Sequence, residues 1–211
     1  QVVKDLLNLG GNVQQDFLYI PQIEKLFSVP STGVFEFGCD VTIPTNPTTS
    51  QGLMGYSQFS ASTSRYGINI GGSGTNITFV TRSSSLISTP ITTYLGQRVN
   101  IKCGYYDTTP QGRFYIDDVL VSSVNNVVRP STPLSTQEFF IGAFGNASGG
   151  SPQNNIYFDG KLHSFFIDGE TWSLPEGSGF NTVSDLGTTA FGQTSNSGSL
   201  SYWNGTVWDS E

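Results

Sequence analysis

The chain has 211 residues, of which 36% are hydrophobic, 13% aromatic and only 12% charged, and its formal net charge is -7 at pH 7. This length fits one all-β domain, and the apolar content is sufficient for a core between two packed sheets. The negative charge argues against a nucleic-acid partner, because Lys and Arg supply most of the affinity for phosphates. No run of about eighteen apolar residues occurs, so no membrane span is predicted.

The first segment, residues 1–16, is predicted to be a tether or a short helix, because apolar residues recur at helical spacing before Gly10 and Gly11. Residues 17–211 are predicted to form one β-sandwich domain, since short runs with alternating apolar residues are separated by turn clusters. The predicted strands are Phe17–Ile20, Val34–Ile43, Gly52–Ser57, Arg65–Ile70, Asn76–Arg82, Arg98–Tyr106, Gly112–Ile116, Val119–Ser123, Glu138–Phe144, Ile156–Phe158, Lys161–Ile167, Thr171–Leu174 and Ser199–Trp203.

Two pairs of turn residues predict tight hairpins between neighbouring strands. Asp168 and Gly169 separate two apolar runs, and both residue types tolerate the positive φ that such a turn requires. Asp117 and Asp118 occupy an equivalent place. From Gly177 onward the chain is rich in Ser, Thr, Gly and Asn, which predicts a loop-rich end with one late strand.

Both cysteines lie at positions that alternate with polar residues, Cys39 with Phe37 and Val41 and Cys103 with Ile101 and Tyr105. Both side chains are therefore expected to point into the core. We favour two free thiols that behave as small hydrophobic groups. A bridge between neighbouring strands is the alternative.

The pattern of carboxylates and the single histidine argue against an enzyme. Glu36 and Asp40 share one face of a predicted strand, but four residues at roughly 3.3 Å each place their Cα atoms about 13 Å apart. That distance exceeds the separation of a working glycosidase pair. His163 is the only His and has apolar neighbours, and no Gly-x-Ser-x-Gly turn is present. A non-catalytic protein is predicted.

Several segments carry a resemblance to a known family. "GQRVNIKCGYYDTTPQGRFYIDDVLVSS" and "FFIGAFGNASGGSPQNNIYFDGKLHSFFIDGE", after the opening pair "DFLYIPQIEKLF" and "GVFEFGCDVTIP", follow the order of strands in the family. The chain thereby resembles the concanavalin A-like lectin and glucanase superfamily in its laminin-G-like form. Asp118 replaces a Gly of the family's hairpin, and His163 stands where the family often has Asp. "TWSLPEGSGFNTVSDLG" resembles an opening segment but lies near the C-terminus, which predicts a circularly shifted strand order.

The resemblance implies a two-sheet antiparallel jelly-roll sandwich that serves as a non-catalytic carbohydrate-binding or adhesion module. Modules of this kind on tailed phages occur in fibres, spikes and capsid decorations. The resemblance therefore also implies a place on a virion surface, or outside the cell on a bacterial surface, with glycans, surface polysaccharide and other subunits as partners. The alternative is a structural fibre or decoration protein that joins subunits, copies of itself included, without a glycan ligand.

Glycan binding requires an aromatic ring that stacks on a sugar, beside amides and charged groups that bond its hydroxyls. Ordinary packing within the sandwich is the alternative role for such residues. The candidates, expected on loops, are Tyr56, Arg65, Tyr66, Tyr106, Asn154, Asn155 and Trp172. Two further tryptophans, Trp203 and Trp208, suit either a subunit contact or a sugar.

Calcium is the one cofactor that the resemblance suggests, since related folds often hold it with loop carboxylates and carbonyls. The alternative role of these acids is in turns, where Asp bonds its own backbone. The candidate ligands are Asp107, Asp117, Asp118 and Asp159.

Overall fold

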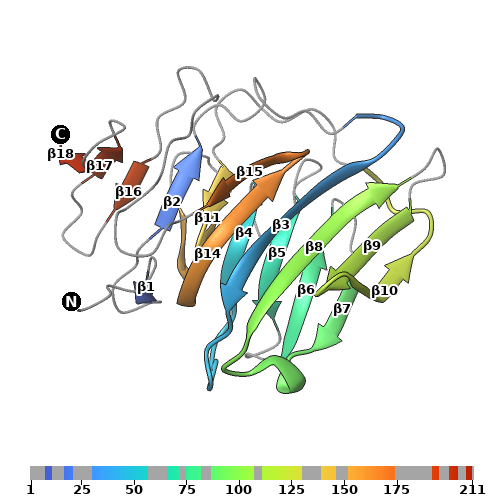
Figure 1. The fold of residues 1–211 in the computed structure, drawn as a ribbon, viewed down its shortest axis with the longest axis horizontal. Coiled ribbons are helices and arrows are strands. Elements are labelled where there is room, and N and C mark those ends of the chain that lie inside the picture. The colour runs from blue at the N-terminus through green and yellow to red at the C-terminus, as the bar shows by residue number, and fades with distance from the viewer. Residues whose placement is uncertain are drawn as a thin grey trace.

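The computed structural model describes residues 8–10, 17–20, 30–56, 66–71, 75–81, 87–106, 111–129, 139–145, 152–173, 192–194, 200–203 and 208–210. Within these ranges most residues lie in strands, and the helical element is the short 3-10 helix η2 (Thr92–Tyr94). Two antiparallel-rich sheets pack face to face, as Figure 1 shows for β14, β3 and β8 in front of β4, β5 and β6. The predicted all-β jelly-roll sandwich is confirmed. In the described part of the chain, no helix is both long enough and apolar enough to cross a membrane.

The first sheet, called sheet A, carries the surface on which the functional argument depends. Its order is β1-β14-β3-β8-β9-β10, and β15 also pairs with β14. The N-terminal part of β14 pairs with β1 and its C-terminal part with β15. The strands are β1 (Asn8–Gly10), β3 (Phe35–Thr42), β8 (Arg98–Tyr106), β9 (Gln111–Ile116), β10 (Val119–Val124), β14 (Asp159–Ile167) and β15 (Glu170–Ser173).

The second sheet, sheet B, has the order β18-β17-β16-β2-β11-β4-β5-β6-β7, and β12 and β13 are attached beside β4. Its strand β13 pairs in parallel with β4, whereas its other pairs are antiparallel. The strands are β2 (Phe17–Ile20), β4 (Gln51–Tyr56), β5 (Tyr66–Gly71), β6 (Asn76–Val80), β7 (Ile87–Pro90), β11 (Phe139–Ile141), β12 (Ala143–Gly145), β13 (Pro152–Tyr157), β16 (Gly192–Thr194), β17 (Leu200–Trp203) and β18 (Trp208–Ser210).

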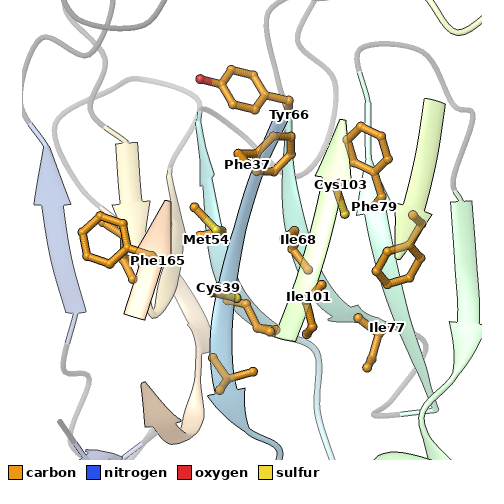
Figure 2. Packing of buried hydrophobic residues seen from close by; sticks show 14 of the residues in the cluster. Phe37, Cys39, Met54, Tyr66, Ile68, Ile77, Phe79, Ile101, Cys103 and Phe165 are labelled. Atoms are coloured by element: carbon orange, nitrogen blue, oxygen red, sulfur yellow. The ribbon is translucent and has the colours of Figure 1, made fainter. Parts of the chain in front are cut away.

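The core lies between the sheets and is made by alternate residues of each strand. Phe37 of β3 is fully buried, and its ring centroid lies 5.1 Å from that of Tyr66 and 5.6 Å from that of Phe79, both nearly edge-on. Figure 2 shows these rings between the two sheets, with Ile68 and Ile101 below them. Edge-to-face rings add to the stabilisation that burial of their area provides. This aromatic cluster fixes the sheets against each other.

Over β4 and β5, the outer face of sheet B is covered by the chain itself. Gly55 and Gly67 are paired across β4 and β5, and the ring of Phe144 occupies the space that side chains at these two glycines would need. Phe144 forms a small apolar cluster there with Val80 and Ile156. The outward side chains of sheet A, in contrast, include many that are only partly buried. Sheet A is therefore the sheet whose described outer face offers side chains to a ligand.

The structure confirms most predicted strands but corrects both ends of the chain. Asn8–Gly10 pairs with β14, so this segment belongs to sheet A rather than to a separate tether. The remainder of the predicted tether or helix, residues 1–7 and 11–16, lies outside the described residues. The C-terminal part contains β16, β17 and β18 rather than one late strand.

Other differences concern single strands and turns. The predicted strand Glu138–Phe144 is divided by Gly142, whose φ of 80° interrupts the extended backbone. The predicted hairpins are confirmed, because Asp117, Asp118 and Asp168 have φ of 49°, 62° and 49°. The segment that predicts a circularly shifted order is described only as far as Ser173, so most of it lies outside the described residues.

Cys39 and Cys103 are both buried and free, as we favoured, and Figure 2 shows them within the core. Burial raises the pKa of both thiols above the usual value; the charge of Asp40 adds to this for Cys39, and Cys39 adds to it for Cys103. We expect neither thiol of the folded protein to react with dithiobis(nitrobenzoic acid) at pH 8, and both to react in guanidinium chloride. A denatured signal that appears only after reduction would instead reveal a bridge and contradict this prediction.

Candidate functional site

The candidate site lies on the outer face of sheet A, where β3, β8 and β9 run side by side. Because Phe37, Cys39 and Val41 point inward from β3, the alternate residues Glu36, Gly38 and Asp40 point outward. The register then places the outward residues of the three strands next to one another. Six of them are connected by side-chain contacts and are called the sheet A cluster: Glu36, Lys102, Tyr106, Gln111, Arg113 and Tyr115.

Tyr106 connects the two halves of the sheet A cluster. Its hydroxyl donates to Oε1 of Glu36, although the two residues are 70 positions apart in the sequence. Gly104, directly opposite Glu36, permits this contact, because a Cβ there would lie 3.1 Å from Cγ of Glu36. Burial raises the pKa of the Tyr106 phenol, and the hydrogen bond to Glu36 and its charge raise it further. Tyr106 therefore stays a neutral donor that positions the Glu36 carboxylate.

Arg113 is held in place by Tyr106 and Gln111, and Gln111 is held in turn by Asn125. Its Cζ lies 4.5 Å from the centroid of the Tyr106 ring, and its Nε donates to Oε1 of Gln111 at 2.6 Å. Gln111 in turn donates through Nε2 to Oδ1 of Asn125 at 2.7 Å. A guanidinium over an aromatic face is attracted by the ring quadrupole, and the amide chain fixes its direction. The result is a preorganised set of donors and acceptors on rigid strands.

Tyr115 provides the aromatic ring of the sheet A cluster that stays partly exposed. Its ring meets Tyr106 in a T-shaped contact with 6.2 Å between centroids, and the ammonium of Lys102 lies 4.9 Å from its centroid. Lys102 also donates to Oδ1 of Asp118 at 3.1 Å. Lys102 is thereby drawn toward β9 and toward the turn that follows it. A partly exposed ring beside fixed polar groups suits the apolar face of a sugar.

The carboxylates on β3 have separate partners. Asp40 accepts a bidentate interaction from Arg98, with Nε–Oδ1 and Nη2–Oδ2 distances of 3.0 and 2.7 Å. Glu36 accepts from Tyr106 instead. Both side chains point outward, as predicted, and each belongs to a different set of contacts. The arrangement is that of structural carboxylates on a sheet face and does not form a paired acid and base.

The predicted glycan-binding residues are distributed over different parts of the fold, and those that the structure describes lie on strands rather than on the expected loops. Tyr66 is fully buried in the core, so it offers no face to a ligand, and the prediction for this residue is wrong. Tyr106 lies on β8 within the sheet A cluster. Arg65 lies outside the described residues. The backbone positions of the other candidates lie on strands, but their side chains are outside what is described: Tyr56 on β4, Asn154 and Asn155 on β13, and Trp172 on β15.

The predicted calcium ligands do not come together among the described residues. Oδ1 of Asp117 accepts from the backbone N–H of Asn100 at 2.8 Å, and Oδ1 of Asp118 accepts from Lys102. Asp159 is exposed on β14, and Asp107 lies outside the described residues. The described side chains contain no group of three or more His, Cys, Asp or Glu that could hold a metal ion. Asp117 and Asp118 thus act as turn residues, the alternative role that the sequence had left open.

His163 has a packing role. It lies at a bulge of β14, is 9% exposed, and its Nε2 is 2.8 Å from Oγ1 of Thr42. Its low exposure and this contact show that His163 packs against β3.

Sequence reasoning missed several members of the sheet A cluster, namely Lys102, Gln111, Arg113 and Tyr115. The available signal was the alternation along β9, where Phe114 and Ile116 are buried and the residues between them point outward. The meeting of Tyr106 with Glu36 has no local signal, because it depends on the register between β3 and β8.

No protein-family model matches the sequence, and no curated protein matches it either. Among solved structures, the chain is similar to a heptameric pentraxin from Limulus polyphemus, with 16% identity, a TM-score of 0.54, and coverage of 76% of this chain and 73% of that one. It is similar to a protein from Bacteroides ovatus whose name proposes carbohydrate binding, with 11% identity, a TM-score of 0.56, and coverage of 81% and 43%. It is also similar to domains LG4-5 of the mouse laminin alpha1 chain, with 11% identity, a TM-score of 0.57, and coverage of 95% and 50%.

These likenesses establish the fold, because each neighbour has the concanavalin A-like jelly-roll architecture of lectins and glucanases. The chain has this fold, so the fold that the sequence resemblance implied is confirmed. The match spans half or less of the Bacteroides and laminin chains. At these identities the likeness describes architecture, and the function must be argued from the site.

Proposed function

We propose that the protein is a non-catalytic carbohydrate-binding module and that the sheet A cluster is its binding site. The observation that carries the proposal is the partly exposed Tyr115 ring, beside a guanidinium, an amide and a carboxylate held in place by their own contacts. A sugar presents an apolar face to stack and hydroxyls that both donate and accept. The cluster offers both kinds of partner on strands, which hold them more rigidly than loops do.

The structural neighbours support the binding role without naming a ligand. One neighbour has a name that proposes carbohydrate binding, and the others are a pentraxin and laminin domains. The low share of charged residues agrees with a site for polar, weakly charged partners. The separate engagement of Glu36 and Asp40 supports a role without hydrolysis.

The proposal includes a location, on a phage virion or on a bacterial surface outside the cell. It is supported by the sequence resemblance to modules of phage fibres, spikes and capsid decorations. Immunogold labelling of purified virions and of host cells tests this part. Label confined to the cell interior would contradict it.

We expect the protein to bind at least one immobilised glycan on a broad array of bacterial and eukaryotic glycans. Tyr115→Ala should weaken that binding about tenfold, the loss that corresponds to one aromatic stacking contact. Val128→Ala, at an exposed apolar position outside the cluster, is the matched control and should bind as the parent does. Circular dichroism verifies that both variants are folded. Absence of binding to every glycan, or equal binding by Tyr115→Ala, would contradict the proposal.

A structural role on a virion, joining subunits without a glycan, is the second candidate. One observation favours it: β10 is an edge strand of sheet A, and its Val119 and Leu120 are 64% and 50% exposed. Exposed apolar residues on an edge strand are a ready contact for another chain. Sedimentation at micromolar concentration separates the candidates, because a stable oligomer with no affinity for any glycan would favour this second role.

A further inference from the structure

A row of outward residues crosses sheet A from β14 to β9. The register pairs Phe166 with Gly38, Gly38 with Lys102, and Lys102 with Tyr115. The row therefore runs perpendicular to the strands, with an aromatic residue at each end. Both rings are partly exposed. At about 4.8 Å between neighbouring strands, the backbones of β14 and β9 are about 14 Å apart along this row.

Gly38, beside Lys102 in the middle of the row, is buried. The ring of Phe166 leans over Gly38, since a Cβ at Gly38 would lie 2.6 Å from Cε1 and 2.9 Å from Cζ of that ring. The carbonyl oxygen of Ile101 would also obstruct a side chain at Gly38. Lys102 is drawn the other way, toward Tyr115 and Asp118. Lys102 therefore lies between the Phe166 ring and the Tyr115 ring, and its side chain points toward Tyr115.

Cations do not predominate on this face among the described residues. Arg98 is paired with Asp40 and Lys102 with Asp118. The cations are Arg98, Lys102, Arg113 and Lys161, and the carboxylates of the same strands and their turns are Glu36, Asp40, Asp117, Asp118, Asp159 and Asp168. Because there is no excess of positive charge, the face has no field that would favour a polyanion such as a sulfated or uronic-acid glycan. A neutral ligand matches it better.

We propose that this row takes a linear, neutral oligosaccharide laid across the strands, from the Phe166 ring, which covers Gly38, to the Tyr115 ring of the sheet A cluster, with a sugar unit stacked on each ring. This inference rests on the proposed carbohydrate-binding function and narrows its substrate class. A single terminal sugar reaches only one of the two rings, because β3 and β8 separate the strands that carry them. Lys102, Arg113 and Gln111 would bond hydroxyls at the Tyr115 end.

The test is a titration of the full chain with neutral oligosaccharides of defined length. The probes are cello-, xylo- and manno-oligosaccharides of one to six units, with oligogalacturonates of the same lengths as charged probes, followed by calorimetry and by amide chemical shifts. We expect affinity for at least one neutral series to rise with chain length until both rings are covered, and then to level off. The Gly38 and Lys102 amides should shift together with that of Tyr115.

Variants separate the two ends of the row. Phe166→Ala should lower the affinity for the longest bound probe about tenfold and leave the affinity for the shortest bound probe unchanged, since the shorter one can occupy the Tyr115 end alone. Phe166→Leu, which keeps apolar bulk but not the ring, guards against loss of folding. Val128→Ala again serves as the matched control.

The outcomes distinguish this inference from the proposed function. Equal affinity for one unit and six units, no effect of Phe166→Ala, or binding of the charged probes alone would overturn the crosswise site. Binding to glycans on the array but to none of the neutral oligosaccharides would also overturn the crosswise site. Each of these results would leave the proposed carbohydrate-binding function intact. Failure to bind any glycan in either experiment overturns both.

Discussion

Replacing Phe37 with alanine is expected to lower the free energy of unfolding by about 3–5 kcal/mol, the usual cost of truncating a buried Phe. The ring is fully buried, and it contacts both Tyr66 of β5 and Phe79 of β6 across the sandwich. Its removal leaves a cavity and ends two edge-to-face contacts between the sheets. Because the free energy of unfolding of such domains is only about 5–15 kcal/mol, this substitution should remove a large part of it.

Equilibrium denaturation in urea measures this effect through the midpoint and slope of the transition. Phe37→Leu should cost less, because it keeps most of the apolar volume. Val34→Ala is the matched control, since Val34 is 54% exposed and its truncation should change the free energy by less than about 0.5 kcal/mol. A Phe37→Ala variant as stable as the Val34→Ala variant would contradict the packing described for this core.

The second large effect is expected at Arg129, which is buried beneath the start of β3. Its Nη1 donates to the carbonyl of Pro30 at 3.0 Å and its Nη2 to the carbonyl of Gly33, and its Cζ lies 5.7 Å from the Tyr105 ring centroid. Arg129→Ala removes hydrogen bonds from a charged donor and leaves both carbonyls without it. Charged hydrogen bonds contribute about 1.5–3 kcal/mol each, so we expect a loss of roughly 3 kcal/mol.

Arg98→Ala is the comparison variant, because it removes an exposed arginine and so tests whether the loss of stability at Arg129 depends on burial. The Arg98 side chain is 58% exposed, and its ion pair with Asp40 should contribute at most about 1 kcal/mol. Added salt should weaken the Arg98 contribution and leave that of Arg129 largely unchanged. Thermal or urea denaturation of both variants at two salt concentrations provides the measurement. Equal losses in the two variants would show that Arg129 does not act as a buried anchor.

Most strands could be predicted because each carries its own alternation of apolar and polar residues. β8 shows this clearly, since Val99, Ile101 and Cys103 are buried and the predicted bounds Arg98–Tyr106 are those observed. Strands at the ends of the chain were missed or misjudged because short segments such as Asn8–Gly10 carry too few residues to show a period. These segments become strands through their partners, β1 through β14.

The candidate site was only partly predictable. Tyr106 was among the predicted residues and lies in the candidate site. Tyr66 was predicted to bind a glycan because it is aromatic. Its alternation with Ile68 and Ile70 indicates an inward position instead, and all three residues are buried. Aromatic residues serve cores and binding sites equally well, so their type alone does not separate the two roles. The outward position of Tyr115 on β9 was available from alternation and was not used.

The sequence by itself determined which residues of each strand turn inward, which turns carry positive φ, and that two sheets enclose a common core, because these properties depend on neighbours along the chain. Only the tertiary structure decided which outward residues meet. Glu36 reaches Tyr106 and Phe166 leans over Gly38 because strands distant in sequence are paired in one particular register. A shift of that register by one residue would turn every such contact to the opposite face of the sheet.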